Sequence, residues 1–155
     1  MRRTRISLAV LLLLATVACI HKTGGTVTPM ERVTTDNALF AQINNSVEQG
    51  AEAVAASGLL TPQQVAPVIA WTGQVAQAHQ QITAIMAKGD ISAADLVSVQ
   101  ALVAQIQQSG LALVNSGTIG IKNPKSQQTI SADVTAVTNL AETILAELTQ
   151  IRGAN

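Results

Sequence analysis

The stretch Gly58-Leu59-Leu60-Thr61-Pro62-Gln63-Gln64-Val65 has the residues expected where one helix ends and another begins. Glycine readily adopts the left-handed conformation that closes a helix, so Gly58 marks the end of the preceding helix. Thr61 is a suitable N-cap, Pro62 suits the first helical position, and Gln64 completes a capping box. We therefore predict a helix that begins at residue 62.

Similar signals recur along the chain. Three glycines lie at equal intervals of 31 residues, each three residues before a candidate N-cap: Gly58, Gly89 and Gly120. Ser92 is the second N-cap, with Asp95 in the capping-box position, and Asn123-Pro124 is a weaker third start. Because the side chains at corresponding positions differ, the repeat is one of length and not a duplicated sequence.

Between these breaks, apolar residues recur at alternating intervals of three and four, which places them on one face of a helix. The row of the first helix is Phe40, Ile43, Val47, Gly50 and Val54, and that of the second is Val68, Trp71, Val75, Ala78, Ile82 and Ile85. The third row is Leu96, Val99, Val103, Ile106, Gly110 and Leu113, and the fourth is Ile130, Val134, Val137, Ala141, Ile144, Leu148 and Ile151.

These patterns predict an all-α fold, an up-down-up-down four-helix bundle over residues 34–152 with helices near 35–57, 62–88, 93–115 and 124–152. Short connections make successive helices antiparallel. Pro67 conflicts with a regular second helix, because proline cannot donate a hydrogen bond to the carbonyl of residue 63. Either the helix is kinked at Pro67, or residues 61–66 form a separate turn.

The first 18 residues have the features of an export signal. Arg2, Arg3 and Arg5 form a basic start, and residues 6–18 are uncharged and mostly apolar. This run is shorter than the roughly 20 residues that a membrane span needs, so it fits a secretory signal peptide. Residues 19–33 show no helical period, and we expect them to be a flexible tether.

Thr16-Val17-Ala18-Cys19 resembles the lipobox of bacterial lipoprotein precursors, although that family prefers leucine where this chain has Thr16. The resemblance is confined to this N-terminal segment. It implies cleavage between Ala18 and Cys19, acylation of Cys19, and stable anchoring by two or three acyl chains. In Gram-negative members an Asp after the cysteine favours the inner membrane, so Ile20 implies the outer membrane, with the bundle facing the periplasm.

An alternative for this segment is cleavage after Ala18 by the ordinary signal peptidase, which leaves Cys19 as a free thiol. Cys19 is the only cysteine, so an internal disulfide is excluded. A lone exposed thiol is unusual in an exported protein, and acylation accounts for its presence.

The net charge and the low aromatic content make some classes of binding partner unfavourable. Removal of residues 1–18 lowers Lys plus Arg from 9 to 6 while Asp plus Glu stays at 9, so the mature chain has a net charge of −3. A chain without a basic patch is a poor partner for nucleic acid. One Phe, one Trp and no Tyr leave little material for stacking on bases or caging cations.

The titratable residues form no recognised catalytic or metal-binding pattern. His79 is the single histidine after the tether, and we expect it to be a partly buried structural residue beside an apolar row. Glu48 and Glu52 share a helix face, for which a solvated surface is the simplest explanation. We therefore expect no enzyme activity, no metal ion and no cofactor.

Three residues are candidates for contact with a partner: Trp71, Ile119 and Ile121. Trp71 lies in an apolar row, so the core is its first expected place and a partner anchor the alternative. The two isoleucines lie in the third connection, where they either contact a partner or cover the end of the bundle.

The leading hypothesis is a non-enzymatic, membrane-anchored lipoprotein whose bundle acts as an interaction or envelope-structural module with a protein partner. An alternative is a carrier that holds a small apolar ligand or lipid in the bundle interior. A tethered oligomer with seams paired between chains is a further alternative, because the sequence leaves the oligomeric state open.

Overall fold

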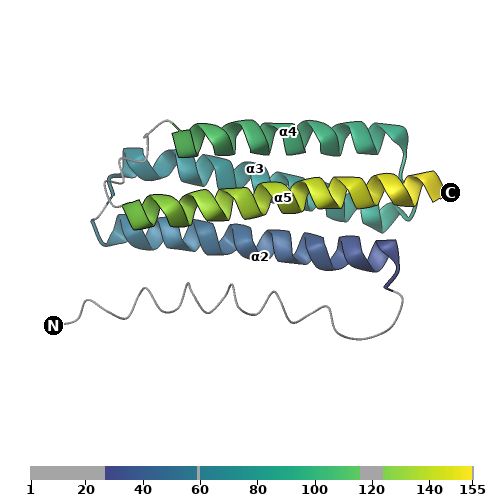
Figure 1. Ribbon diagram of the computed structural model, residues 1–155, viewed down its shortest axis with the longest axis horizontal. Coiled ribbons are helices and arrows are strands. Elements are labelled where there is room, and N and C mark those ends of the chain that lie inside the picture. The colour runs from purple at the N-terminus through teal and green to yellow at the C-terminus, as the bar shows by residue number, and fades with distance from the viewer. Residues whose placement is uncertain (1–26, 59, 116–123, 155) are drawn as a thin grey trace.

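The structure is a computed structural model that describes residues 27–58, 60–115 and 124–154. The described residues form four long helices, α2 (Pro29–Ala56), α3 (Pro62–Lys88), α4 (Ala93–Asn115) and α5 (Pro124–Ala154). Figure 1 shows them lying alongside one another. The expected all-α four-helix bundle is confirmed.

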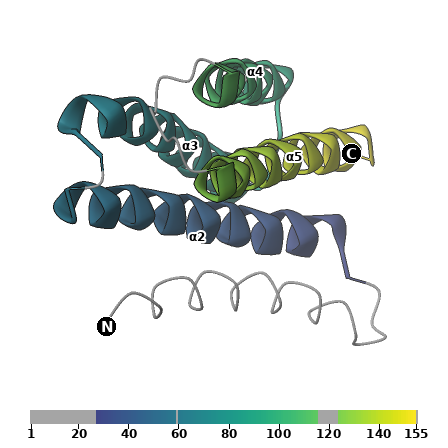
Figure 2. The same cartoon turned by 60° about the vertical axis from the view of Figure 1, so that its left-hand side comes forward.

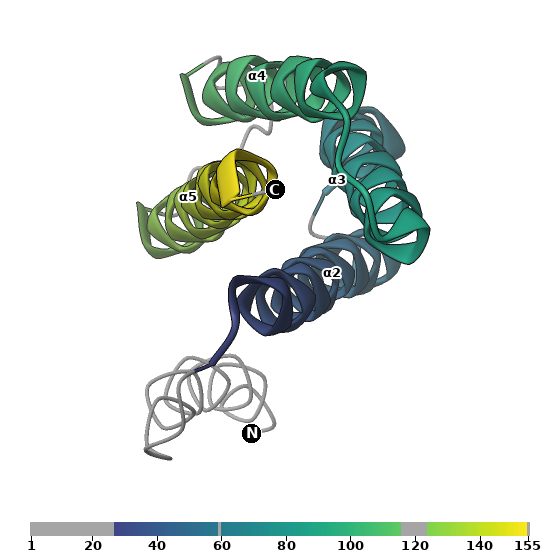
Figure 3. The same ribbon diagram turned by 90° about the vertical axis from the view of Figure 1, so that its right-hand side faces the viewer.

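Each helix packs against two neighbours. Both α2 and α4 contact α3 and α5, and within the described residues neither diagonal pair comes into close contact. The view in Figure 3 shows the four helices arranged around a common centre, with α5 closing the ring. Successive helices alternate in direction, as Figures 1 and 2 show, so the topology is up-down-up-down.

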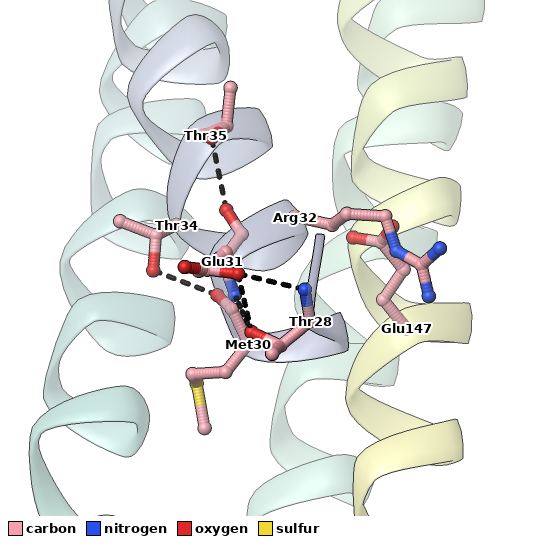
Figure 4. Close-up of polar contacts among 7 residues, drawn as sticks. All are labelled: Thr28, Met30, Glu31, Arg32, Thr34, Thr35 and Glu147. Carbon is pink, nitrogen blue, oxygen red and sulfur yellow. Dashed lines mark hydrogen bonds and ion pairs between the residues drawn. The ribbon is translucent and has the colours of Figure 1, made fainter. Parts of the chain in front are cut away.

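The first helix begins earlier than expected. α2 starts at Pro29 and not near residue 35, so the predicted flexible tether is wrong for residues 29–33. Thr28 and Glu31 form a capping box in which the Thr28 N–H donates to Glu31 Oε2 at 2.8 Å and the Glu31 N–H donates to Thr28 Oγ1 at 3.3 Å (Figure 4). The Thr28 N–H also holds the pKa of Glu31 below its ordinary value.

The starts of α3 and α4 agree with the sequence signals. At α3 the Thr61 N–H donates to Gln64 Oε1 at 2.8 Å, which completes the capping box. At α4 the Ser92 hydroxyl donates to Asp95 Oδ2 at 2.7 Å. This bond, together with Lys88, lowers the pKa of Asp95 to about 2.

Two of the three spaced glycines close helices as predicted. Gly58 has φ +72° and Gly89 has φ +74°, which is the left-handed region that other residues rarely adopt. Gly120 and Asn123, which the sequence placed at the third break, lie outside the described residues.

Proline does not interrupt the second helix. α3 runs continuously from Pro62 to Lys88 with Pro67 inside it, so the alternative of a separate turn at residues 61–66 is wrong. The hydrogen bond to the carbonyl of Gln63 is necessarily absent. Because this carbonyl lies in the first turn of α3, the rest of the helix keeps its hydrogen-bond ladder.

The core follows the predicted rows in three of the four helices. The buried members of these rows are Val68, Trp71, Val75, Ala78, Ile82 and Ile85 in α3, Val99, Val103, Ile106, Gly110 and Leu113 in α4, and Val134, Val137, Ala141, Ile144 and Leu148 in α5. Leu96 and Ile151 are half-buried, and the side chain of Ile130 lies outside the described part.

The predicted row of α2 is only partly right beyond Phe40. Gly50 is exposed and Val54 is half-buried, whereas Ile43 and Val47 are half-buried and pack against the core. The buried residues of this helix are Val33, Asn37, Phe40 and Asn44. They also recur at intervals of four and three, so the row exists but includes two asparagines and begins in the segment predicted to be a tether.

Candidate functional site

Of the residues singled out for function, Trp71 is the one that lies in the described part. Ala18, Cys19, Ile119 and Ile121 lie outside the described residues. The anchor and the connection between α4 and α5 therefore stay predictions from the sequence.

Trp71 is a core residue. It is 1% exposed, and its indole N–H donates to the carbonyl of Ile106 at 3.1 Å. Gly110 packs against the ring so closely that a Cβ there would lie 3.1 Å from Trp71 Nε1 and 2.7 Å from Val134 Cγ1. The predicted partner contact is wrong for Trp71, because its ring is buried and its polar atom already has an acceptor.

Three polar side chains join α2 to α3. Asn37 Nδ2 donates to Thr83 Oγ1 at 2.9 Å, and the Thr83 hydroxyl donates to the carbonyl of His79 at 2.9 Å. His79 Nδ1 lies 3.1 Å from Asn37 Oδ1 and 3.2 Å from the Asn37 carbonyl oxygen. Because both of these Asn37 oxygens are hydrogen-bond acceptors, they favour the His79 tautomer that carries its hydrogen on Nδ1. His79 is half-buried and structural, as expected.

Asn44 is a second polar contact between the same helices. It is 2% exposed, and its Nδ2 donates to the carbonyl of Thr72 at 3.1 Å. Its Oδ1 makes no hydrogen bond within the described residues. A buried amide that is half satisfied costs stability, but it favours one register of helix pairing over others. The sequence signal for this contact is asparagine at core spacing from Asn37 and Phe40.

Glu147 on α5 lies beside the start of α2, as Figure 4 shows. Its side chain is 12% exposed, and Oε1 lies 3.4 Å from Arg32 Nε. Oε2 is buried without a hydrogen bond among the described residues. Burial, and then the negative charge of Asp36, raise the pKa of Glu147, and Arg32 offsets this only in part.

We expect Glu147→Gln to raise the melting temperature at pH 7 by a few degrees. Because the folded pKa of Glu147 lies above its ordinary value of 4.5, the unfolded chain releases this proton more readily. The ionised group therefore opposes folding above the folded pKa, and this effect disappears below about pH 4.5.

Thermal unfolding followed by circular dichroism at pH 7 and pH 4 checks this expectation. The gain from Glu147→Gln should be present at pH 7 and absent at pH 4, whereas the exposed control Glu52→Gln should change little at either pH. A lower melting temperature for Glu147→Gln at pH 7 would show that the Arg32 pair outweighs the cost of burial.

The described part has an open apolar groove on its surface but no cluster of metal-binding side chains. Among the described residues, no three His, Cys, Asp or Glu side chains lie close enough to hold a metal ion. An open apolar groove of about 570 Å³ lies between α2 and α3, lined by Glu52, Ala55, Pro62, Val65, Ala66, Ile69 and Ala70. Of these lining residues Glu52 alone is charged, so the groove brings no pair of polar groups together.

α4 is the one described helix that is long and apolar enough to cross a membrane by length and composition, with a mean hydropathy of 1.2. The core helix of a bundle can meet the same criterion, and α4 contributes Val99, Val103, Ile106, Gly110 and Leu113 to this core. In comparisons with protein-family models, with curated proteins and with solved structures, nothing matches this chain.

Proposed function

We propose that this chain is a lipoprotein of the bacterial cell envelope whose four-helix bundle is a non-enzymatic interaction or structural module. The observation that carries the proposal is Thr16-Val17-Ala18-Cys19, which follows a basic start and a short apolar run. Acyl chains on Cys19 hold the chain at a membrane, and Ile20 favours the outer membrane facing the periplasm.

The early start of α2 supports a position of the bundle close to that membrane. Residues 20–27 are all that separates Cys19 from the N-cap Thr28. Eight residues reach at most about 28 Å when fully extended. The proposed module is therefore held near the lipid surface, where its partners would be other envelope components.

Removal of the acylated sulfur tests the anchor. We expect the wild-type chain in the membrane fraction, with a mass that starts at Cys19 and includes two or three acyl chains. Cys19→Ala, exported behind an ordinary signal peptide in place of residues 1–18, should move to the soluble fraction, because it has no site for acylation. Its helix content should equal that of the wild type, since the described core begins at Val33.

Membrane fractionation and mass spectrometry of the intact chain provide the two readouts, with circular dichroism as the control for folding. Retention of folded Cys19→Ala in the membrane fraction would contradict anchoring through Cys19. A wild-type mass without acyl chains would show that the ordinary signal peptidase processes this chain.

The alternative function, a carrier of an apolar ligand in the bundle interior, stays a prediction. The layer of Trp71, Gly110 and Val134 gives it no support, because one added carbon at Gly110 already meets two side chains. Native mass spectrometry of the chain extracted from membranes separates the two functions. An added protein subunit supports the interaction module, and an added small ligand supports the carrier.

A further inference from the structure

The outer face of α4 carries apolar side chains that the bundle does not use. Val97 is 65% exposed and Leu111 is 60% exposed, the highest values for large apolar residues in the described part. They belong to an exposed row at alternating intervals of four and three, which we call the outer row: Val97, Ala101, Ala104, Gln108 and Leu111. α4 thus has two rows with the spacing of a helix–helix contact, of which the bundle buries one.

The outer row itself carries no charge, and the charged groups nearest to it lie at its edges: the Lys88–Asp95 pair near Val97, and Glu142 of α5, which accepts a hydrogen bond from Gln107. Residues 96–115 contain no Asp, Glu, Lys or Arg, and neither do residues 62–87 of the neighbouring α3. Most charged residues of the described part lie on α2 and α5, which carry Glu31, Arg32, Asp36, Glu48, Glu52, Lys125, Asp133, Glu142, Glu147 and Arg152. An uncharged face is desolvated at little cost in a contact with another apolar helix, and it offers nothing to a charged partner.

We propose that the outer row of α4 binds the outer row of a second copy of this chain, with the two helices antiparallel. A contact with two-fold symmetry requires a surface that is complementary to itself. With the axis at Ala104, Val97 faces Leu111 of the second copy, and both are large. The smaller Ala101 lies within one residue of the level of the longer Gln108 of the second copy, and the two Ala104 methyl groups meet at the centre, where small residues let the helices approach.

The size of the contact indicates a weak dimer. α4 has 23 residues, which is about 35 Å at 1.5 Å per residue. A strip of that length and about 10 Å width covers roughly 350 Å² on each copy, less than the about 800 Å² per partner of a standard stable interface. Confinement of two copies to one membrane raises their effective concentration, so this step rests on the proposed function.

α3 provides the matched comparison. It also has an exposed row at these intervals, Ala66, Ala70, Gly73, Gln77, Gln80 and Ala84. This row contains no large apolar side chain, so its burial releases little apolar area. Gln77 is the control position for Ala104, because both are exposed and lie near the middle of an uncharged outer row. A cysteine at either position presents the same thiol to the solvent.

Disulfide cross-linking in membranes that contain the full chain tests the contact. Single variants Ala104→Cys and Gln77→Cys, and the double variant Val97→Cys/Leu111→Cys, are treated with a mild oxidant and run on non-reducing gels. We expect Ala104→Cys to form at least about tenfold more dimer than Gln77→Cys. The double variant should also form dimer, whereas Val97→Cys alone and Leu111→Cys alone should not.

Equal cross-linking of Ala104→Cys and Gln77→Cys would overturn the proposal. Strong dimer from Val97→Cys alone would overturn the antiparallel orientation, since Val97 faces its own counterpart only in a parallel pair. Val97→Glu/Leu111→Glu in the Ala104→Cys background should abolish the dimer by placing charges in the contact. Both positions are exposed, so helix content should be unchanged, and persistence of the dimer would also contradict the contact.

Two further readouts show whether the proposed acylation of Cys19 is wrong, independently of the α4 contact. A disulfide dimer of the wild-type chain would show that Cys19 is a free thiol, and fractionation of the same samples shows where the chain lies. In that case Ala104→Cys and Gln77→Cys are compared in a Cys19→Ser background at high concentration of purified chain. The same excess of dimer from Ala104→Cys would support the α4 contact without the anchor, and equal yields would overturn it.

Discussion

Trp71→Ala is expected to lower the free energy of unfolding by about 3–5 kcal/mol, the range for removal of a large aromatic side chain from a packed core. Trp71 is among the largest fully buried side chains of the described part, and it packs where α3, α4 and α5 meet through Gly110 and Val134. Small domains have a total stability of about 5–15 kcal/mol, so this variant is expected to lose a large share of it.

The indole hydrogen bond accounts for a small part of this effect. Trp71→Phe keeps an aromatic ring but removes the donor to the carbonyl of Ile106. We expect it to cost less than Trp71→Ala, because a typical hydrogen bond contributes about 1 kcal/mol and the phenyl ring fills most of the site. A similar loss in both variants would show that the hydrogen bond, and not the volume, dominates.

Urea unfolding followed by circular dichroism measures both variants. Tryptophan fluorescence is unsuitable, because Trp71 is the only tryptophan of the chain. Val97→Ala is the control, and its effect should be within about 0.5 kcal/mol, since Val97 is an exposed residue. A loss below about 1.5 kcal/mol for Trp71→Ala would indicate that the surrounding helices collapse into the space.

Much of α3 and α4 follows from the sequence, because local signals and tertiary packing agree there. Thr61 and Gly89 determine where α3 begins and ends through hydrogen bonds and conformations that involve only neighbouring residues. Between Val68 and Ile85 the buried hydrogen-bonding side chains of α3 are Trp71, which the apolar row includes, and Thr72, which it omits. The other buried residues are apolar, so apolar spacing identifies the side of this helix that faces the core.

α2 shows why the same reasoning fails elsewhere. Apolar spacing leaves Asn37 and Asn44 out of the core, yet they are buried because side-chain and backbone groups of α3 pair with their amides. That pairing depends on which helix is the neighbour, which apolar spacing does not reveal. The start at Pro29 is different, because the capping box of Thr28 and Glu31 has the same local signal as the one at Thr61 and could have been found in the sequence.

The candidate sites could be predicted from the sequence even less well than the buried row of α2. Cys19, Ile119 and Ile121 lie outside the described residues, and Trp71 is a core residue. The outer row of α4 is not apparent from the sequence, because Val97 and Leu111 are two apolar residues among many beside the predicted row. Only their exposed fractions, together with the burial of the opposite row, show that α4 has an unused face.

Gly110→Ala is expected to lower the free energy of unfolding by about 1–2 kcal/mol, although alanine is the better helix former. The new Cβ would lie 2.7 Å from Val134 Cγ1 and 3.1 Å from Trp71 Nε1. Val134 is short and branched at Cβ, so it moves only with its backbone or into another rotamer. Overpacking of this kind costs about 1–3 kcal/mol, whereas replacing glycine in a helix interior contributes up to about 1 kcal/mol.

Gly73→Ala is the matched control, because it makes the same chemical change inside a helix without the crowding. Gly73 lies exposed in α3, and an added Cβ there has no atom within 4 Å. We expect this variant to be more stable than the wild type by about 0.5–1 kcal/mol, chiefly because the unfolded chain loses conformational freedom. Urea unfolding of the two variants should therefore give changes of opposite sign. Stabilisation by both would mean that α4 and α5 separate at Gly110 at little cost, and the tight layer around Trp71 would not hold the bundle together.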